Sequence, residues 1–297
     1  MKTGFVALLG RPNAGKSTLL NAILSKKVSI VSPRSQTTRD DILGIYNEKD
    51  LQIVYVDTPG LFEGEEALYK AMYHAARRSL SDVDALCYLV DCSIDSFEQD
   101  DAFLKSIKLD KPKFLLLNKI DKVRLPRIEE IKAHFKETAK DYKMIEISAL
   151  KNFGLKDIKL ALKEALPEGL PFYPEDVITD KDRPFTAKEV IRESLLHFLK
   201  EEIPHDCAVV IDSFEAKEDN KAALIKATIY CSKNNQKAII VGKSGDMIKK
   251  ISMRSRHELE SMWKMNVSLY CNVEVLENWR NDPRKLLKIG YGNKKRS

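Results

Sequence analysis

Gly10-Arg-Pro-Asn-Ala-Gly15-Lys16-Ser17 stands between an apolar run at residues 4–9 and an amphipathic run from Lys16 to Leu24. It matches the pattern G-x-x-x-x-G-K-[S/T] in the strand–loop–helix setting that a phosphate-binding loop requires. The glycines let the backbone curl until successive N–H groups point at one oxyanion, and the helix N-terminus reinforces that attraction. We expect Lys16 to reach the β- and γ-phosphates and the Ser17 hydroxyl to hold Mg²⁺. The predicted phosphate-binding residues are Gly10, Arg11, Pro12, Asn13, Ala14, Gly15, Lys16, Ser17 and Thr18.

Short apolar runs and amphipathic stretches alternate through the first 165 residues. The apolar runs read as buried strands, and the stretches between them read as helices. This order predicts an α/β domain with a mostly parallel sheet and helices on both faces. After residues 4–9 the expected strands are 51–56, 85–90, 113–117 and 144–147. The expected helices are 16–24, 67–80, 125–142 and 155–166.

Three further motifs follow expected strands, at the sheet edge where open α/β sheets bind ligands. Asp57-Thr58-Pro59-Gly60 offers a carboxylate for Mg²⁺ and an amide for the γ-phosphate. Asn118-Lys119-Ile-Asp121 selects guanine, because adenine would leave the Asp121 carboxylate unpaired. Ser148-Ala149-Leu150 can offer a backbone N–H to guanine O6. Together these motifs predict a site for GTP or GDP with Mg²⁺ in residues 1–165.

A polar stretch without periodicity, residues 35–40, lies between the phosphate loop and Asp57. Thr38 is the first candidate there for a Mg²⁺ ligand and Thr37 the second, while an ordinary exposed Ser/Thr loop is the alternative. The predicted metal ligands are therefore Ser17, Thr38 and Asp57. Leu61 stands where many small GTPases carry the Gln that orients water. Hydrolysis is then slow, or it uses another device. The amide oxygen of Asn13 could hold a monovalent cation beside the phosphates, so we expect K⁺ to stimulate hydrolysis. The candidate catalytic residues are Asn13, Lys16, Thr38 and Gly60.

A chain of 297 residues is long enough for about two domains. Charge is distributed unevenly along it. Residues 221–297 carry 17 basic and 6 acidic side chains, a net +11 against +6 for the whole chain. Such a segment favours a polyanion partner, with a solvated Lys-rich face as the alternative. The five cysteines are scattered and predict no disulfide framework. Since no run approaches the ~18 apolar residues of a spanning helix, we expect a cytoplasmic protein.

A Pro-rich break at residues 166–174 separates two patterns and predicts a linker. The expected limits are 1–167 for the GTPase domain, 168–180 for the linker and 181–297 for a second domain. That domain reads α-β-β-α-α-β. Its expected elements are a helix at 186–200, strands at 208–214 and 223–230, an apolar strip at 238–241, a helix at 246–263 and a strand at 267–275.

Gly242-Lys243-Ser244-Gly245 lies between the two later helices of this second pattern. G-x-x-G is the device that clamps about four nucleotides of single-stranded RNA, although most instances are simple turns. Here a helix with several basic residues follows it, so we expect RNA binding, with a solvated basic face as the alternative. The candidate RNA-binding residues are Gly242, Lys243, Ser244, Gly245, Lys249, Lys250, Arg254 and Arg256.

The chain resembles the bacterial Era GTPases over essentially its whole length. The resemblance rests on the motifs above together with Gln36-Thr-Thr-Arg39, Tyr173-Pro-Glu-Asp176, Glu202-Ile-Pro-His205 and Gln236-Lys-Ala-Ile-Ile-Val-Gly242. It implies a KH domain of the second type, binding to the 3′ end of 16S ribosomal RNA, and a role in 30S subunit maturation. It also implies peripheral association with the inner membrane, and we expect a monomer. The segment at residues 61–70 is shorter than in the family, and Gln236 lacks the usual acidic-basic pair before it.

The sequence leaves two alternatives to this resemblance open. A related GTPase acting on tRNA or the large subunit would need extra domains or a second GTPase unit, and the sequence has neither. A GTP-regulated RNA-binding module, in which hydrolysis is not the output, is favoured by Leu61. Multiple-turnover hydrolysis would count against that second alternative.

Overall fold

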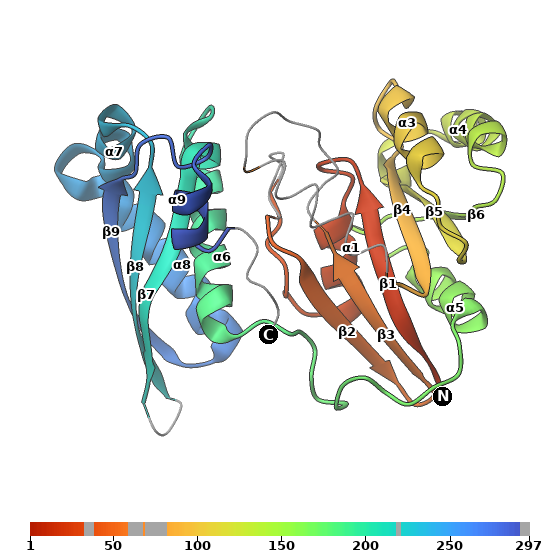
Figure 1. The fold of residues 1–297 in the computed structure, drawn as a ribbon, viewed down its shortest axis with the longest axis horizontal. Helices are drawn as coiled ribbons and strands as arrows, with labels where there is room; N and C mark the ends of the chain where they lie inside the picture. Colours follow the sequence, from red (N-terminus) through yellow and green to blue (C-terminus); the bar gives the residue numbers. More distant parts are fainter. Residues whose placement is uncertain (33–38, 59–67, 69–81, 218–220, 292–297) are drawn as a thin grey trace. The chain divides into compact units, whose positions relative to one another are not determined.

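The computed structural model describes residues 1–32, 39–58, 68, 82–217 and 221–291 (Figure 1). The chain divides into two compact units. The first comprises Met1–Glu63 and Met72–Asp180, and the second comprises Gly64–Ala71 and Lys181–Ser297. No helix in the described ranges is both long enough and apolar enough to cross a bilayer.

The first unit is built on a six-stranded sheet with the order β2-β3-β1-β4-β5-β6. β2 is antiparallel to β3, and every other neighbouring pair is parallel. The predicted mostly parallel α/β sheet is therefore confirmed. The strands are β1 (Lys2–Gly10), β2 (Ile42–Glu48), β3 (Leu51–Asp57), β4 (Ala85–Asp91), β5 (Lys113–Asn118) and β6 (Lys143–Glu146).

Helices cover both faces of this sheet (Figure 1). Because successive side chains of a strand point to opposite faces, Leu8 and Leu9 of β1 enter different cores. Leu8 packs in the core that contains residues of α1 (Lys16–Leu24) and α5 (Leu155–Ala165). Leu9 packs in the core that contains residues of α3 (Glu98–Ser106) and α4 (Leu125–Thr138).

Apart from the short 3-10 helix η1 (Ile120–Lys122), two elements of the first unit were not predicted. β2 is an edge strand that follows the polar stretch at 35–40, and its sequence ILGIYNE contains a glycine and ends in two polar residues, so it is not a continuous apolar run. α3 buries only Asp100 and Leu104, so its sequence carries little helical periodicity. α4 ends at Thr138, four residues before the expected end. The helix expected at 67–80 lies outside the described residues except for Leu68.

Residues 168–180, predicted as a linker, pass from the start of β1 at Glu168 to the outer edge of β2 at residues 175–180 in the first unit. Ile45 N donates to Ile178 O at 2.9 Å, and Gly44 and Thr179 form an antiparallel bridge. The buried Gln52 side chain fixes the start of this segment. Its Oε1 accepts from the Phe172 amide at 2.6 Å, and its Nε2 donates to Tyr173 O at 2.8 Å. This part of the chain therefore serves as an added edge of the sheet.

The second unit has the predicted α-β-β-α-α-β order around a sheet β7-β8-β9. β7 and β8 are antiparallel, whereas β8 and β9 are parallel. Its core joins Ile191 and Leu195 of the first helix to Ile240 and Ile251 of the later two. The elements are α6 (Arg183–Phe198), η2 (Ile203–Asp206), β7 (Cys207–Ala216), β8 (Ala222–Cys231), α7 (Asn234–Val241), η3 (Lys243–Gly245), α8 (Asp246–Trp263), β9 (Asn266–Val275) and α9 (Pro283–Lys288). The short α9 was not predicted.

Candidate functional site

The predicted phosphate loop connects β1 to α1, as its sequence setting required. Gly10 has φ 144° and Gly15 has φ 105°, conformations that residues with a side chain rarely adopt. A Cβ at Gly10 would lie 2.5 Å from Leu89 O, and one at Gly15 would lie 2.3 Å from Asn118 Nδ2. Both glycines are therefore required by backbone conformation and by close neighbours.

Lys16, the first residue of α1, is buried inside the curl of the loop. Its Nζ donates to Gly10 O at 3.0 Å and to Arg11 O at 3.1 Å. Burial lowers the pKa of Lys16 to about 8, and the nearby Asp57 carboxylate opposes that shift. The ammonium group is thus held at the loop by two carbonyls, which an anionic ligand could replace.

Asp57 ends β3 and is fully buried. Its Oδ2 accepts from Ser17 Oγ at 2.8 Å and from Ser29 Oγ at 3.1 Å. Its Oδ1 is buried and has no hydrogen-bond partner among the described residues, and burial raises the pKa of Asp57. An orphaned carboxylate oxygen beside a serine hydroxyl is a donor set that suits Mg²⁺, so the residues present fit the expected ion.

Asn118, the last residue of β5, links two loops of the site. Its Nδ2 donates to Ala14 O at 2.7 Å, and its Oδ1 accepts from Ala149 N at 3.0 Å. One buried amide therefore fixes the phosphate loop against the predicted base-binding loop. Ala149 N–H, one of the candidates for guanine O6, is used in this bridge.

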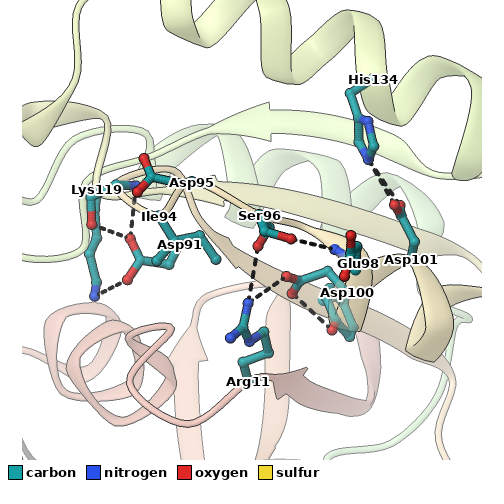
Figure 2. Close-up of polar contacts among 12 residues, drawn as sticks. Arg11, Asp91, Ile94, Asp95, Ser96, Glu98, Asp100, Asp101, Lys119 and His134 are labelled. Carbon is teal, nitrogen blue, oxygen red and sulfur yellow. Dashed lines mark hydrogen bonds and ion pairs between the residues drawn. The ribbon is translucent and has the colours of Figure 1, made fainter.

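The other residues of Asn118–Asp121 are held by neighbouring segments. Lys119 forms an ion pair with Asp91 at 2.5 Å (Figure 2). Asp121 is exposed, and its Oδ1 accepts from Ser148 Oγ at 2.5 Å. The carboxylate is thus oriented by one hydrogen bond and remains open to a ligand on its other oxygen.

The structure brings the phosphate loop, Asp57, Asn118–Asp121 and Ser148–Ala149 to one edge of the sheet. Thr58 is buried there, with its hydroxyl bonded to Leu8 O at 3.0 Å. The Leu150 side chain is 67% exposed. Thr38, its alternative Thr37, Pro59, Gly60 and Leu61 lie outside the described residues.

Sequence reasoning missed two partners in this site. Ser29 contacts Asp57 but lies in a segment with no periodicity, so no signal marked it. Asp91 holds Lys119, and it could have been found because it ends a buried strand at the ligand-binding edge.

The G-x-x-G loop connects α7 to α8, with positive φ at Gly242 (77°), Ser244 (52°) and Gly245 (81°). A Cβ at Gly242 would lie 2.7 Å from Met247 Cβ, whereas one at Gly245 would meet nothing within 4 Å. Close packing therefore requires the first glycine, and backbone conformation alone favours the second. The Lys243 and Ser244 side chains are exposed.

The four predicted basic residues of α8 occupy two flanks of the helix, on either side of its exposed centre. Lys250 and Arg254 are one turn apart on one flank, and Arg256 is on the opposite flank, by the helical period. Lys250 pairs with Asp246 at 2.6 Å, and Arg256 with Glu260 at 3.9 Å. Ile240 of the apolar strip at 238–241 is buried, while Ile239 is 48% exposed.

These two units define a phosphate-loop GTPase domain followed by an RNA-binding domain of the KH class. Residues 5–119 match the family model of the 50S ribosome-binding GTPases, and residues 202–280 match that of the KH domain. GTPase Era of Caldicellulosiruptor saccharolyticus is 42% identical over 296 residues, covering 99% of this chain and 98% of the relative. GTPase Era of Lactobacillus delbrueckii subsp. bulgaricus is 42% identical over 294 residues, covering 99% and 97%. The chain belongs to the GTPase Era family.

Two crystal structures of Era are similar along the whole chain. One, of Era in complex with MgGDPNP and nucleotides 1506–1542 of 16S ribosomal RNA, has a TM-score of 0.94 at 35% identity. It covers 99% of this chain and 100% of its own. The other, an Aquifex aeolicus Era variant bound to GDP and AlF₄⁻, has a TM-score of 0.91 at 37% identity, with coverage of 99% and 100%.

Proposed function

We propose that this chain binds and hydrolyses GTP and binds 16S ribosomal RNA near its 3′ end, acting in 30S subunit maturation. The observation that carries the nucleotide half is the Asn118 bridge, which fixes the phosphate loop against the guanine loop. For the RNA half, the crystallised Era complex with a 16S RNA segment supports the proposal.

Each nucleotide contact is assigned to the residue whose geometry suits it. Backbone N–H groups from Asn13 to Ser17 receive the phosphates, and Lys16 exchanges its two carbonyl acceptors for phosphate oxygens. Asp121 accepts from guanine, Asn118 braces the loops and Lys119 lines the base. Thr18, Thr58, Pro59, Gly60, Ser148, Ala149 and Leu150 complete the proposed pocket.

Mg²⁺ would be held by Ser17, Asp57 and Thr38, and it would neutralise charge that develops on the phosphates. The orphaned Asp57 Oδ1 supports this assignment. In the described part of the chain no group of three or more His, Cys, Asp and Glu side chains could hold a metal. The ion would therefore depend on these few oxygens together with the nucleotide's own.

Hydrolysis is assigned to Asn13, Lys16, Thr38 and Gly60. Asn13 is exposed at the phosphate loop with φ 64°, where its amide oxygen can reach a monovalent cation beside the phosphates. We expect faster multiple-turnover hydrolysis in K⁺ than in Na⁺ buffer, and equal rates would contradict the role of Asn13. Absence of turnover in both would favour the alternative, a GTP-regulated RNA-binding module.

RNA binding is assigned to the loop from Gly242 to Gly245 and to the basic residues Lys249, Lys250, Arg254 and Arg256. The loop's positive φ angles and exposed Lys243 support a close backbone approach to RNA. We place the GTPase domain at 1–167, the linker at 168–180 and the KH domain at 181–297. The proposed location is the cytoplasm, with peripheral association to the inner membrane, and the proposed state is a monomer.

The coupling of the two domains is tested with a labelled RNA matching the 3′ end of 16S RNA. Its affinity is measured at one fixed salt concentration with GDP and again with a non-hydrolysable GTP analogue. Tighter binding with the analogue is the expected result. Equal, salt-sensitive binding in both states would contradict the switch, and absence of binding in both would contradict the RNA half of the proposal.

A further inference from the structure

Asp100, in the first turn of α3, is a buried carboxylate outside every motif of the predicted site. Its side chain is 1% exposed. Oδ1 accepts from Tyr88 Oη at 3.1 Å, and Oδ2 lies 3.5 Å from an Arg11 guanidinium nitrogen. Burial raises the pKa of Asp100, and Arg11 opposes that shift. Because a buried charge is costly unless it is paired and hydrogen-bonded, this carboxylate requires an explanation.

Arg11 is the cation that compensates Asp100, and it belongs to the phosphate loop. Among the described residues it is the only positively charged partner within ion-pair distance of this carboxylate. The same Arg11 nitrogen donates to Ser96 O at 3.3 Å. Figure 2 shows the Arg11 side chain reaching from the loop to the segment that carries Ser96 and Asp100. The loop is therefore tied through this side chain to the start of α3.

The backbone of Arg11 takes part in the shape of the loop itself. Its carbonyl oxygen accepts from Lys16 Nζ at 3.1 Å and from Ala14 N at 3.2 Å. Asn13, inside the same turn, has φ 64°, a conformation that costs energy in a residue with a side chain. A turn of this kind persists when its surroundings hold it, and the contact with Asp100 holds it from outside.

We propose that Asp100 is a positioning residue for the nucleotide: with Tyr88 it fixes the Arg11 guanidinium and so keeps the turn from Arg11 to Ala14 ready for phosphates. This inference rests on the proposed binding of guanine nucleotide at that loop. A pre-ordered loop loses less conformational freedom on binding, so freeing it weakens affinity. The loss appears mainly as faster nucleotide dissociation.

The test measures dissociation constants and dissociation rates of fluorescently labelled GDP. Asp100→Asn is expected to raise the dissociation constant about tenfold, and Tyr88→Phe roughly threefold. Arg11→Ala should weaken binding as well, and adding Asp100→Asn to it should change the dissociation constant no further. In that background Asp100→Asn should raise the melting temperature, because it removes an uncompensated buried charge. A merely structural role of Asp100 would not give this non-additive pattern.

Asp101→Asn is the matched control, since Asp101 is the next residue of α3 and pairs at 2.9 Å with the half-exposed His134 instead (Figure 2). It should leave the GDP dissociation constant unchanged. The proposal would be overturned if the folded Asp100→Asn variant kept an unchanged GDP dissociation constant. It would also be overturned if Asp100→Asn weakened GDP binding equally with and without Arg11. If Asp100→Asn does not fold, the same double-mutant cycle is measured with Tyr88→Phe and Arg11→Ala, each alone and both combined. Failure of the unsubstituted protein to bind labelled GDP would instead overturn the proposed nucleotide site.

Discussion

The nucleotide site and the G-x-x-G surface are built in opposite ways. Lys16, Asp57 and Asn118 are 6%, 0% and 2% exposed, and each is bonded to other residues of the site. Lys243 and Lys249 are exposed, and within the described residues neither forms an ion pair. The proposed nucleotide site is thus already bonded within the protein, whereas the proposed RNA surface keeps exposed charges for a partner to contact.

This difference predicts how each region responds to substitution. A buried hydrogen bond that loses one partner leaves the other unsatisfied, at a cost of about 1–3 kcal/mol. An exposed lysine contributes through salt-screened attraction and shares that role with its neighbours. Single changes should therefore have large effects at the nucleotide site and small, cumulative effects on the RNA surface.

The largest expected effect is that of Asn118→Ala. It removes two buried hydrogen bonds and leaves Ala14 O and Ala149 N–H without partners. At the cost given above, GDP affinity should fall about a hundredfold. Titration with labelled GDP measures it, with the exposed Asn272→Ala of β9 as control. A loss below about fivefold would show that the bridge does not organise the site.

Asp121→Asn should change which base is bound rather than abolish binding. The carboxylate offers two acceptors, and the amide offers one acceptor and one donor. GTP affinity should fall by tens of fold, while xanthosine triphosphate affinity should rise above that of the unsubstituted protein. Competition between the two nucleotides measures the switch, and Asp110→Asn at an exposed position is the control. Unchanged GTP affinity would remove the assignment of Asp121 to the base.

The same contrast explains how much could be predicted from the sequence. Motifs such as Gly10–Ser17 are readable because backbone curvature and buried polar pairing allow few residue types at their fixed positions. The α/β alternation and the α-β-β-α-α-β order follow from apolar periodicity, so the main elements of both units were predicted. Thr38 and Gly60 stay predictions, because they lie outside the described residues.

Long-range pairings were not predictable, because nothing local encodes them. Gln52 reads as an ordinary polar residue in a strand, yet it bonds to residues about 120 positions later and fixes the predicted linker to the sheet. Asp100 reads as part of an acidic surface turn, yet it is buried against Arg11. In both cases the polar side chain is explained by a partner that is distant in sequence.

On the RNA surface, Lys243→Ala combined with Arg254→Ala should have a moderate effect. Removing two phosphate contacts should weaken RNA binding by roughly tenfold at low salt and reduce the slope of log affinity against log salt by up to about 1.4. Affinity for GDP should stay the same, because both residues lie in the other unit. RNA titrations across a salt series measure this. An unchanged slope would show that these side chains do not contact phosphates.

The smallest predicted effect separates two adjacent lysines of α8. Lys250 already pairs with Asp246 at 2.6 Å, whereas Lys249 has no ion pair among the described residues. Lys249→Ala should therefore weaken RNA binding about twofold. Lys250→Ala should weaken it slightly less, because Asp246 neutralises part of the Lys250 charge, although an exposed pair does so only weakly. Asp246→Asn should strengthen RNA binding slightly by freeing Lys250. If Lys250→Ala were the more damaging change, local pairing would not govern this surface, and the flank that Lys250 shares with Arg254 would be the side that RNA contacts.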